Sequence, residues 1–222
     1  GHVFIRADLG QIEPRILAAV SGDDALIAAT LEDDMYAPVA ARLGVTREIA
    51  KVAVLGAMYG QTTGQGAVAL RGLESAYPTA MGYLDDAARR AEGGNDLRTR
   101  GGRRVRMSAS TDPGDDDGPG REERSRAAAR GRYGRNAMIQ GAAAEFFKTW
   151  AVIVRARAAT HGARIVLCLH DELLVHAPAD AADAVREIVD DGVQEARYRW
   201  SAGAGVRFVA DTSVVARWSD AK

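Results

Sequence analysis

The sequence predicts an α+β fold, in which an antiparallel sheet is backed by helices and interrupted by a mainly helical insertion. Apolar segments with strand character lie near both ends of the chain. Two of the C-terminal segments are separated only by the polar residues His170, Asp171 and Glu172, which is typical of a tight hairpin. The middle of the chain instead shows the apolar periodicity of helices, so the strands are expected to form one sheet across this insertion.

The first half of the chain is expected to form one strand, several helices and a hairpin. These are a strand over residues 3–8, a helix over 11–20, two helical stretches between 23 and 60, a helix over 73–92 and an arginine-rich hairpin. Pro14 lies in a first helical turn, where its missing N–H costs little. Gly44 separates the two stretches, and Thr46 is the expected N-cap of the second. Gly101 and Gly102 mark the hairpin.

The second half has a simpler pattern. Residues 111–120 form the one low-complexity stretch and are expected to be an exposed loop. A long helix over 136–161, a hairpin over 164–176, a helix over 181–198 and a closing strand over 206–218 follow.

Composition indicates a globular, non-membrane protein. Of the 222 residues, 47% are hydrophobic and 27% charged, and no apolar run approaches the ~18 residues that span a bilayer. The single cysteine, Cys168, excludes an internal disulfide framework and fits a reducing cytoplasm. Since Cys168 lies in an apolar segment, we expect a core thiol rather than a nucleophile. Trp150, Trp200 and Trp218 are expected to be packing aromatics.

The charge is unevenly distributed although its total is only −1. Residues 89–135 hold 13 arginines and 8 acidic residues, a balance of +5, and the remainder holds 16 basic and 22 acidic residues, a balance of −6. A basic surface beside an acidic one suits an enzyme that holds a polyanion and binds metal cations. A solvated arginine-rich face explains the same numbers.

Two carboxylates are expected at strand ends. Asp8 ends the first strand, and Asp171 lies in the turn of the hairpin. If these strands are neighbours, the carboxylates converge and repel one another unless a cation lies between them. Hard oxygen ligands favour Mg²⁺, and two such ions ~4 Å apart promote in-line displacement at phosphorus. The alternative is an ordinary turn residue and an ordinary hairpin.

One predicted helix carries a stripe of related side chains. Arg47, Lys51, Leu55 and Tyr59 are spaced by four residues, so they follow one another along a slowly rotating row ~18 Å long. Two cations followed by an apolar and an aromatic side chain suit the phosphates and base of a nucleoside triphosphate. An amphipathic helix with a basic outer edge gives the same spacing.

Four motifs in order resemble the DNA polymerase I family, and in particular its actinobacterial-type bifunctional 3′–5′ exonuclease/DNA polymerases. The segment from Asp8 to Arg15 (DLGQIEPR) resembles the A motif, and Arg47-x3-Lys51-x7-Tyr59-Gly60 resembles the B motif. The segment Arg132-x3-Asn136-x3-Gln140-Gly141 is similar to a helix that meets primer–template, and His170-Asp171-Glu172 is similar to the C motif. Any one motif is weak, whereas the ordered set is specific.

The resemblance implies a right-hand polymerase fold. Residues 1–22 would be the first part of the palm, 23–131 the fingers and 132–222 the second part of the palm. It also implies that the chain is a fragment, whose thumb and any exonuclease domain would lie before Gly1. The implied activity is template-directed DNA polymerisation in replication or repair, and the implied location is the cytoplasm, in association with the nucleoid.

By the same resemblance, Asp8 and Asp171 bind two Mg²⁺ ions, for which Mn²⁺ is a possible substitute, and Glu172 is an accessory acid. Arg47 and Lys51 hold the triphosphate of a dNTP, with Lys51 also a proton donor to the leaving pyrophosphate. The remaining nucleotide-binding residues would be Gln11, Glu13, Leu55 and Tyr59, with Glu13 at the sugar 2′ position and Tyr59 near the templating base. The residues implied for primer–template DNA are Arg132, Asn136, Gln140 and His170. We expect a monomer that contacts no membrane.

The sequence departs from the family pattern at several positions. Leu9-Gly10 stands where Tyr-Ser is usual, Val54 and Leu55 where an Asn and an aromatic are usual, and Tyr36 where a phosphate-contacting histidine is usual. Two other hypotheses stay open. The departures motivate a non-catalytic DNA-binding module with a decayed nucleotide pocket, and the same carboxylates would serve a metal-dependent phosphohydrolase. The first would show no metal-dependent dNTP binding, and the second would hydrolyse nucleotides without a primer.

Overall fold

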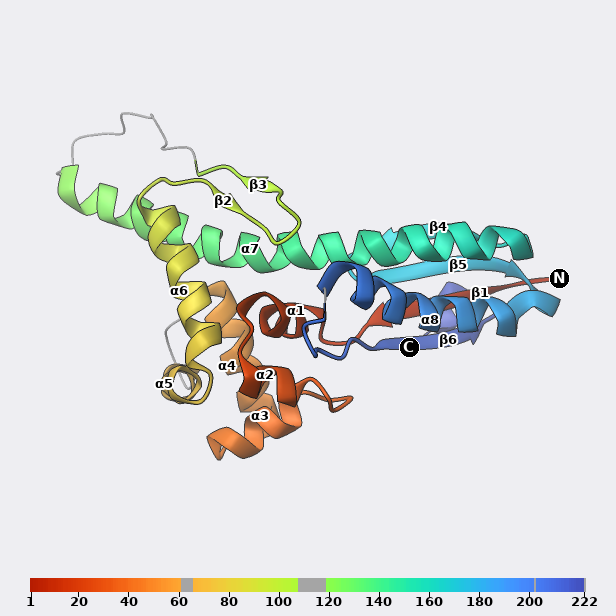
Figure 1. The fold of residues 1–222 in the computed structure, drawn as a ribbon, viewed down its shortest axis with the longest axis horizontal. Coiled ribbons are helices and arrows are strands. Elements are labelled where there is room, and N and C mark those ends of the chain that lie inside the picture. The colour runs from red at the N-terminus through yellow and green to blue at the C-terminus, as the bar shows by residue number, and fades with distance from the viewer. Residues whose placement is uncertain (61–65, 108–118, 202, 222) are drawn as a thin grey trace. The chain divides into compact units, whose positions relative to one another are not determined.

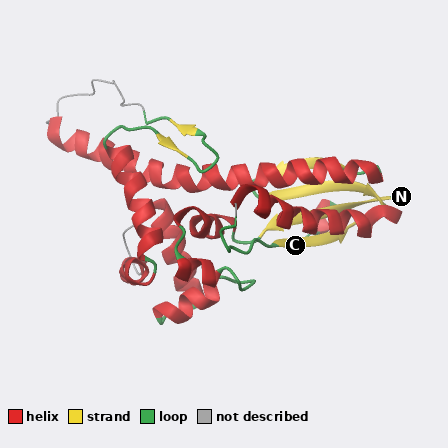
Figure 2. Cartoon of the chain, viewed as in Figure 1, coloured by secondary structure: helices red, strands yellow, loops and turns green. Residues whose placement is uncertain are grey.

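The computed structural model describes residues 1–60, 66–107, 119–201 and 203–221. The chain divides into two compact units. The first joins residues 1–15 to 143–222, and the second comprises residues 16–142. Figures 1 and 2 show that the first contains a sheet with helices and that the second is mainly helical. The predicted α+β fold class is confirmed.

The first unit is built on a four-stranded antiparallel sheet. Its strands are β1 (His2–Leu9), β4 (Arg164–Leu169), β5 (Glu172–Pro178) and β6 (Ala210–Val215), in the order β4-β5-β1-β6. The hairpin predicted around the polar trio is β4–β5, with His170 and Asp171 in the turn and Glu172 as the first residue of β5. The segments at opposite ends of the chain therefore become direct neighbours, because β1 lies between β5 and β6.

Helices cover one face of this sheet. Helix α8 (Ala182–Ser201) packs against β1, β5 and β6, and the C-terminal part of α7 (Pro119–Ala158) packs against α8. Trp150 of α7 is fully buried and donates its indole N–H to the Val189 carbonyl of α8 at 2.9 Å. Gly192 permits this approach, because a Cβ there would lie 3.2 Å from Trp150 and Val154. Short 3₁₀ turns flank these elements at η1 (Ala159–His161), η2 (Ala179–Ala181) and η3 (Trp218–Asp220).

The second unit is a cluster of helices with one small hairpin. Its elements are α2 (Asp24–Ala29), α3 (Tyr36–Leu43), α4 (Arg47–Tyr59), α5 (Gly66–Ala76), α6 (Pro78–Glu92), β2 (Leu97–Arg98), β3 (Arg104–Val105) and the N-terminal part of α7. Helix α1 (Ile12–Ser21) begins in the first unit and ends in the second. Asp23 accepts hydrogen bonds at the starts of both α2 and α6. Glycines on α7 let the hairpin approach closely, since a Cβ on Gly141 would lie 2.7 Å from Thr99.

Several predicted elements differ from the structure in extent. The first stretch between 23 and 60 is two helices, and the helix predicted over 73–92 is two, because Pro78 starts a new helix after Tyr77. The long helix begins at Pro119 rather than at residue 136, and the closing strand is confined to Ala210–Val215. Of the loop expected at 111–120, residues 111–118 lie outside the described part of the chain. Among the described residues, no helix has a stretch both long and apolar enough to cross a bilayer.

Candidate active site

Strand register brings three acidic residues into one row across the sheet. Asp8 of β1 is paired with Glu172 of β5 on one side and with Asp211 of β6 on the other. The Leu9 amide donates to the Asp171 carbonyl at 3.1 Å, so the hairpin turn lies against the end of β1. Strands β1 and β5 are thus sheet neighbours, which is the condition on which the predicted convergence of Asp8 and Asp171 depends.

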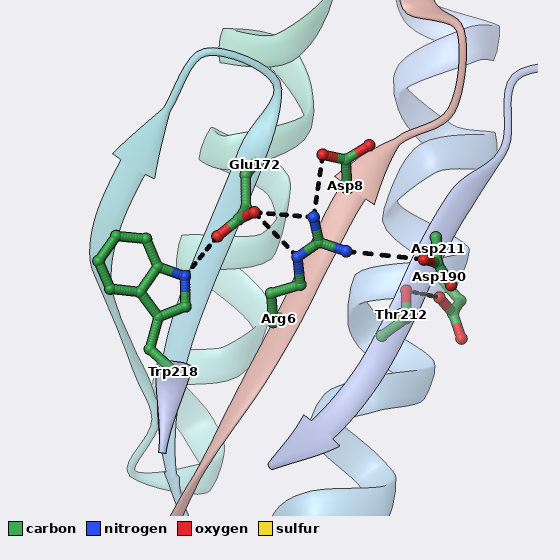
Figure 3. Close-up of polar contacts among 7 residues, drawn as sticks. All are labelled: Arg6, Asp8, Glu172, Asp190, Asp211, Thr212 and Trp218. Carbon is green, nitrogen blue, oxygen red and sulfur yellow. Dashed lines mark hydrogen bonds and ion pairs between the residues drawn. The ribbon is translucent and has the colours of Figure 1, made fainter. Parts of the chain in front are cut away.

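An arginine lies among these carboxylates (Figure 3). Arg6 Nη2 is 3.1 Å from Asp8 Oδ2 and 2.8 Å from Glu172 Oε2, and Arg6 Nε donates to the same Glu172 oxygen at 2.9 Å. Its other terminal nitrogen lies 3.6 Å from Asp211. Arg6 precedes Asp8 by two residues, and residues two apart on a strand point to the same face. The shared face explains why the guanidinium reaches the carboxylate row.

Trp218 completes the surroundings of Glu172. Its indole N–H donates to Glu172 Oε1 at 2.7 Å, so both oxygens of Glu172 accept hydrogen bonds (Figure 3). Trp218 is 44% exposed, and it is therefore not the packing aromatic expected from the sequence. Its place at the end of the predicted closing strand was the available signal; in the structure it is the first residue of η3, after β6.

The charged groups of the row shift the pKa of the Asp8 carboxyl. Burial raises the pKa of the Asp8 carboxyl above its ordinary value, and the negative charge of Asp171 raises it further. The Arg6 guanidinium opposes this rise in pKa, while Glu172 and Asp211 add to it. A nearby cation would lower the pKa again by stabilising the charged form of Asp8.

The other predicted residues of the first unit lie close to these strand ends. His170 is exposed in the β4–β5 turn with a φ of 53°, and Gln11 follows β1 with a φ of 54°. Glu13 is half-buried in the first turn of α1. Arg15 fixes this turn, because its buried guanidinium donates to the carbonyls of Gly10 at 3.1 Å and Arg207 at 2.6 Å.

In the second unit, the predicted stripe lies on α4. Thr46 caps the helix by accepting from the Ile49 amide, as expected, and Arg47 and Lys51 are exposed while Leu55 and Tyr59 are half-buried. Arg47 already has a partner. It donates from Nε to Asp34 at 2.5 Å and from Nη2 to the other Asp34 oxygen at 3.2 Å.

Two of the three positions noted as departures from the family in this unit, Tyr36 and Val54, are buried, and Leu55 is half-buried. Tyr36 is 3% exposed, and the Arg47 guanidinium lies 5.7 Å from its ring centroid. Val54 is likewise buried in the helical cluster. Neither side chain is therefore free to replace the polar contact that its usual counterpart provides.

The three predicted DNA-contacting residues of α7 share the N-terminal part of that helix. Arg132 is exposed and its stem lies on Gly60, where a Cβ would come within 2.9 Å of Arg132 Cγ. Gln140 is exposed, and the side-chain oxygen of Asn136 is buried with no hydrogen-bond partner among the described residues. Arg135 donates to the Ala57 carbonyl at 2.9 Å, which anchors the C-terminal end of α4 to α7.

Comparison with known proteins agrees with this architecture. The sequence matches the model of DNA polymerase family A over residues 1–220. The chain belongs to DNA polymerase family A. As a family A polymerase domain, it is similar to the POL domain of Pol1 from M. smegmatis, solved in complex with DNA primer-template and dNTP. That match has a TM-score of 0.79 and 25% identity, and covers 99% of this chain and 40% of that chain.

Curated relatives of this family A domain are longer proteins. DNA polymerase I of Chloroflexus aurantiacus is 32% identical over 223 residues, which cover 90% of this chain and 22% of that protein. DNA polymerase theta of Caenorhabditis elegans is 28% identical over 207 residues, which cover 88% of this chain and 12% of that protein. The chain thus spans less than a quarter of the length of either relative.

One residue of the polymerase domain contradicts a prediction, and another was not predicted to belong to the site. Cys168 is exposed, so the expected core thiol is wrong, and it lies on β4, which is an edge strand of the sheet. Arg6 was not singled out from the sequence. Its spacing of two from Asp8 was the available signal, although the strand pairing that gives it three acidic partners is not visible in the sequence.

Proposed function

We propose that this chain is the catalytic core of a template-directed DNA polymerase, which adds dNTPs to a primer 3′-hydroxyl in DNA replication or repair. The observation that carries the proposal is the meeting of Asp8 and the Asp171 turn at the end of neighbouring strands. It is supported by membership of DNA polymerase family A and by similarity to a POL domain solved with primer-template and dNTP.

Asp8 and Asp171 would hold the metal. Their hard oxygen donors fit Mg²⁺, with Mn²⁺ as a substitute, and two protein carboxylates suffice for an ion that keeps several waters and binds substrate phosphates. Among the described residues, no group of three or more His, Cys, Asp or Glu side chains is arranged to hold a metal ion. When bound, two such ions would supply activation of the 3′-hydroxyl and stabilisation of the leaving oxygen. Glu172 would be an accessory acid.

Helix α4 would bind the incoming nucleotide. Lys51 and Arg47 would neutralise the triphosphate, and Lys51 would donate a proton to the leaving pyrophosphate. Leu55 and Tyr59 would lie at the base, with Tyr59 near the templating position. Among residues of the first unit, Glu13 would exclude a 2′-hydroxyl and Gln11 would be a further nucleotide-binding residue.

Primer–template DNA would be held mainly through phosphate, sugar and minor-groove contacts. Arg132, Asn136, Gln140 and His170 would make them, so binding would depend little on sequence. Exposure of Arg132, Gln140 and His170, and the unpartnered oxygen of Asn136, support this proposal. Residues 1–22 and 132–222 would be the palm, and residues 23–131 the fingers.

Primer extension by the full-length natural protein tests the proposal. With Mg²⁺, a primer–template and dNTPs, the wild type should extend the primer, and Asp8→Ala or Asp171→Ala should reduce extension at least a thousandfold. Asp180→Asn, an exposed carboxylate elsewhere in the first unit, is the matched control and should extend normally. Retained extension in either Ala variant would rule out the metal assignment. A wild type that holds DNA without metal-dependent dNTP binding would instead identify a non-catalytic binding module.

A further inference from the structure

Arg6 is held firmly among the acidic residues of the sheet. Its backbone lies in the central strand, paired with Leu174 on one side and Ser213 on the other. Its side chain is 17% exposed and contacts Asp8, Glu172 and Asp211. A guanidinium with a paired backbone and three carboxylate neighbours is a fixed part of this surface rather than a mobile surface charge.

Both oxygens of Glu172 are already engaged in hydrogen bonds. Oε2 accepts from two nitrogens of Arg6, and Oε1 accepts from the Trp218 indole. Its side chain is only 14% exposed. A cation would have to compete with these bonds, of which those from Arg6 are charge-assisted and partly buried. By contrast, Arg6 is bonded to a single oxygen of Asp8, Oδ2.

We infer that Arg6 is a positioning residue that, together with Trp218, keeps Glu172 out of the metal's coordination shell and supplies a permanent positive charge beside Asp8. The metal would then be held by Asp8 and Asp171 alone, with an affinity lowered by the neighbouring guanidinium. This inference rests on the proposed function, because it concerns the metal site assigned there.

Removing Arg6 should raise the affinity for the metal ion, whereas structural damage would lower it. Removing Arg6 would free Glu172 Oε2 to act as a third carboxylate ligand and would remove the positive charge beside Asp8. Even with the strong screening of bulk water, a unit positive charge about 6 Å from a divalent cation weakens its binding on the order of tenfold. Arg6→Ser should therefore bind Mn²⁺ at least tenfold more tightly, whereas a variant that merely perturbed the sheet would bind it less tightly.

The test is a titration of the full-length natural protein with Mn²⁺, followed by electron paramagnetic resonance without DNA or dNTP. Arg6→Ser and the longer neutral variant Arg6→Gln should both tighten binding, and thermal unfolding identifies any variant that fails to fold. Arg6→Lys keeps the charge and should stay within about threefold of wild type. Combining Arg6→Ser with Glu172→Gln should cancel much of the gain. The matched control Arg186→Ser removes an exposed arginine of α8 and should change nothing.

Failure of the inference and failure of the proposed function would give different results in this titration. Asp171→Asn should abolish Mn²⁺ binding, and binding that survives this substitution would overturn the metal assignment and the inference with it. If Asp171→Asn abolishes binding but neither neutral Arg6 variant binds more tightly than wild type, the inference alone is overturned.

Discussion

Asp23 provides a quantitative test of how the second unit is held together. Its side chain is almost fully buried, at 4% exposed, and lies just before α2. Oδ1 accepts from the Leu26 amide at 3.0 Å, and Oδ2 accepts from the amides of Thr79 and Ala80 at 3.1 Å each. One carboxylate thus caps the N-termini of α2 and α6, which are more than fifty residues apart in the chain.

Replacing Asp23 with Ala removes all three hydrogen bonds. Loss of an N-cap costs about 0.5–2 kcal/mol, and a buried amide left without a partner costs about 1–3 kcal/mol. With two helix starts affected, we expect local stability to fall by about 2–4 kcal/mol. Since about 1.4 kcal/mol is a factor of ten, amides of both helices should open roughly 30- to 1,000-fold more often.

Hydrogen exchange of the full-length natural protein, followed by mass spectrometry, measures this directly. Peptides from α2 and from α6 should both lose protection in Asp23→Ala, and Asp23→Asn, with one acceptor oxygen, should lose about half as much free energy. Asp24→Ala, at the exposed neighbouring position, should cost less than about 0.5 kcal/mol. Loss of protection in α2 without loss in α6 would refute the shared cap.

Three further predictions concern helix α4 and the hairpin. Leu55→Phe should tighten dNTP binding by about 1–3 kcal/mol in a fluorescence titration of the DNA complex, because stacking on an aromatic is worth that much. Val68→Phe, at an exposed valine of α5, is its control, and unchanged affinity in Leu55→Phe would contradict the stacking argument. Asp34→Asn should lower the Kd for dNTP severalfold, since Arg47 would no longer be held by a carboxylate; an unchanged Kd would show that Arg47 does not contact the triphosphate. The Met107 amide and Arg104 lower the pKa of Asp96, so its stabilisation of the hairpin is present above its unfolded pKa, near 4, and is lost as pH falls through the lower folded pKa. The Met107 amide resonance should report this loss in an NMR titration, and Asp96→Asn should abolish the pH dependence.

The strands were the most predictable part of the fold. Residues 3–8 and the hairpin over 164–176 have the apolar patterning of strands and are found close to where they were expected. The Thr46 cap was equally visible, because a cap depends only on residues within one turn. These features are local in sequence, and local chemistry is sufficient to predict them.

Helix α7 shows what local chemistry misses. Its first turns contain Gly131 and Gly134, which favour a break, and the helix was expected to start only at residue 136. In the structure both glycines lie against α6: a Cβ on Gly131 would meet Glu92, and one on Gly134 would meet Ala91. The close packing that requires glycine is a tertiary contact, and it outweighs the low helix propensity of these residues.

Only part of the candidate site could be predicted from the sequence. Asp8 and Asp171 could be identified from their places at strand ends, but Arg6 and Trp218 acquire their roles only through the pairing of β1 with β5 and the position of the chain after β6. The exposure of Cys168 likewise depends on β4 being an edge strand. Strand order is a long-range property that the apolar pattern of one segment does not contain.

The ion pairs Arg47–Asp34 and Arg6–Asp8 affect the affinity expected for the proposed triphosphate and metal ion. Arg47 is already bonded to Asp34, and Asp8 is already bonded to Arg6. Binding of a triphosphate or a divalent cation would therefore exchange one charged partner for another rather than satisfy a free charge. The net gain in such an exchange is a small difference between large electrostatic terms. Each pair gives its charged group a partner in the absence of substrate, and each should make substrate affinity sensitive to single neutral substitutions at the resident partner.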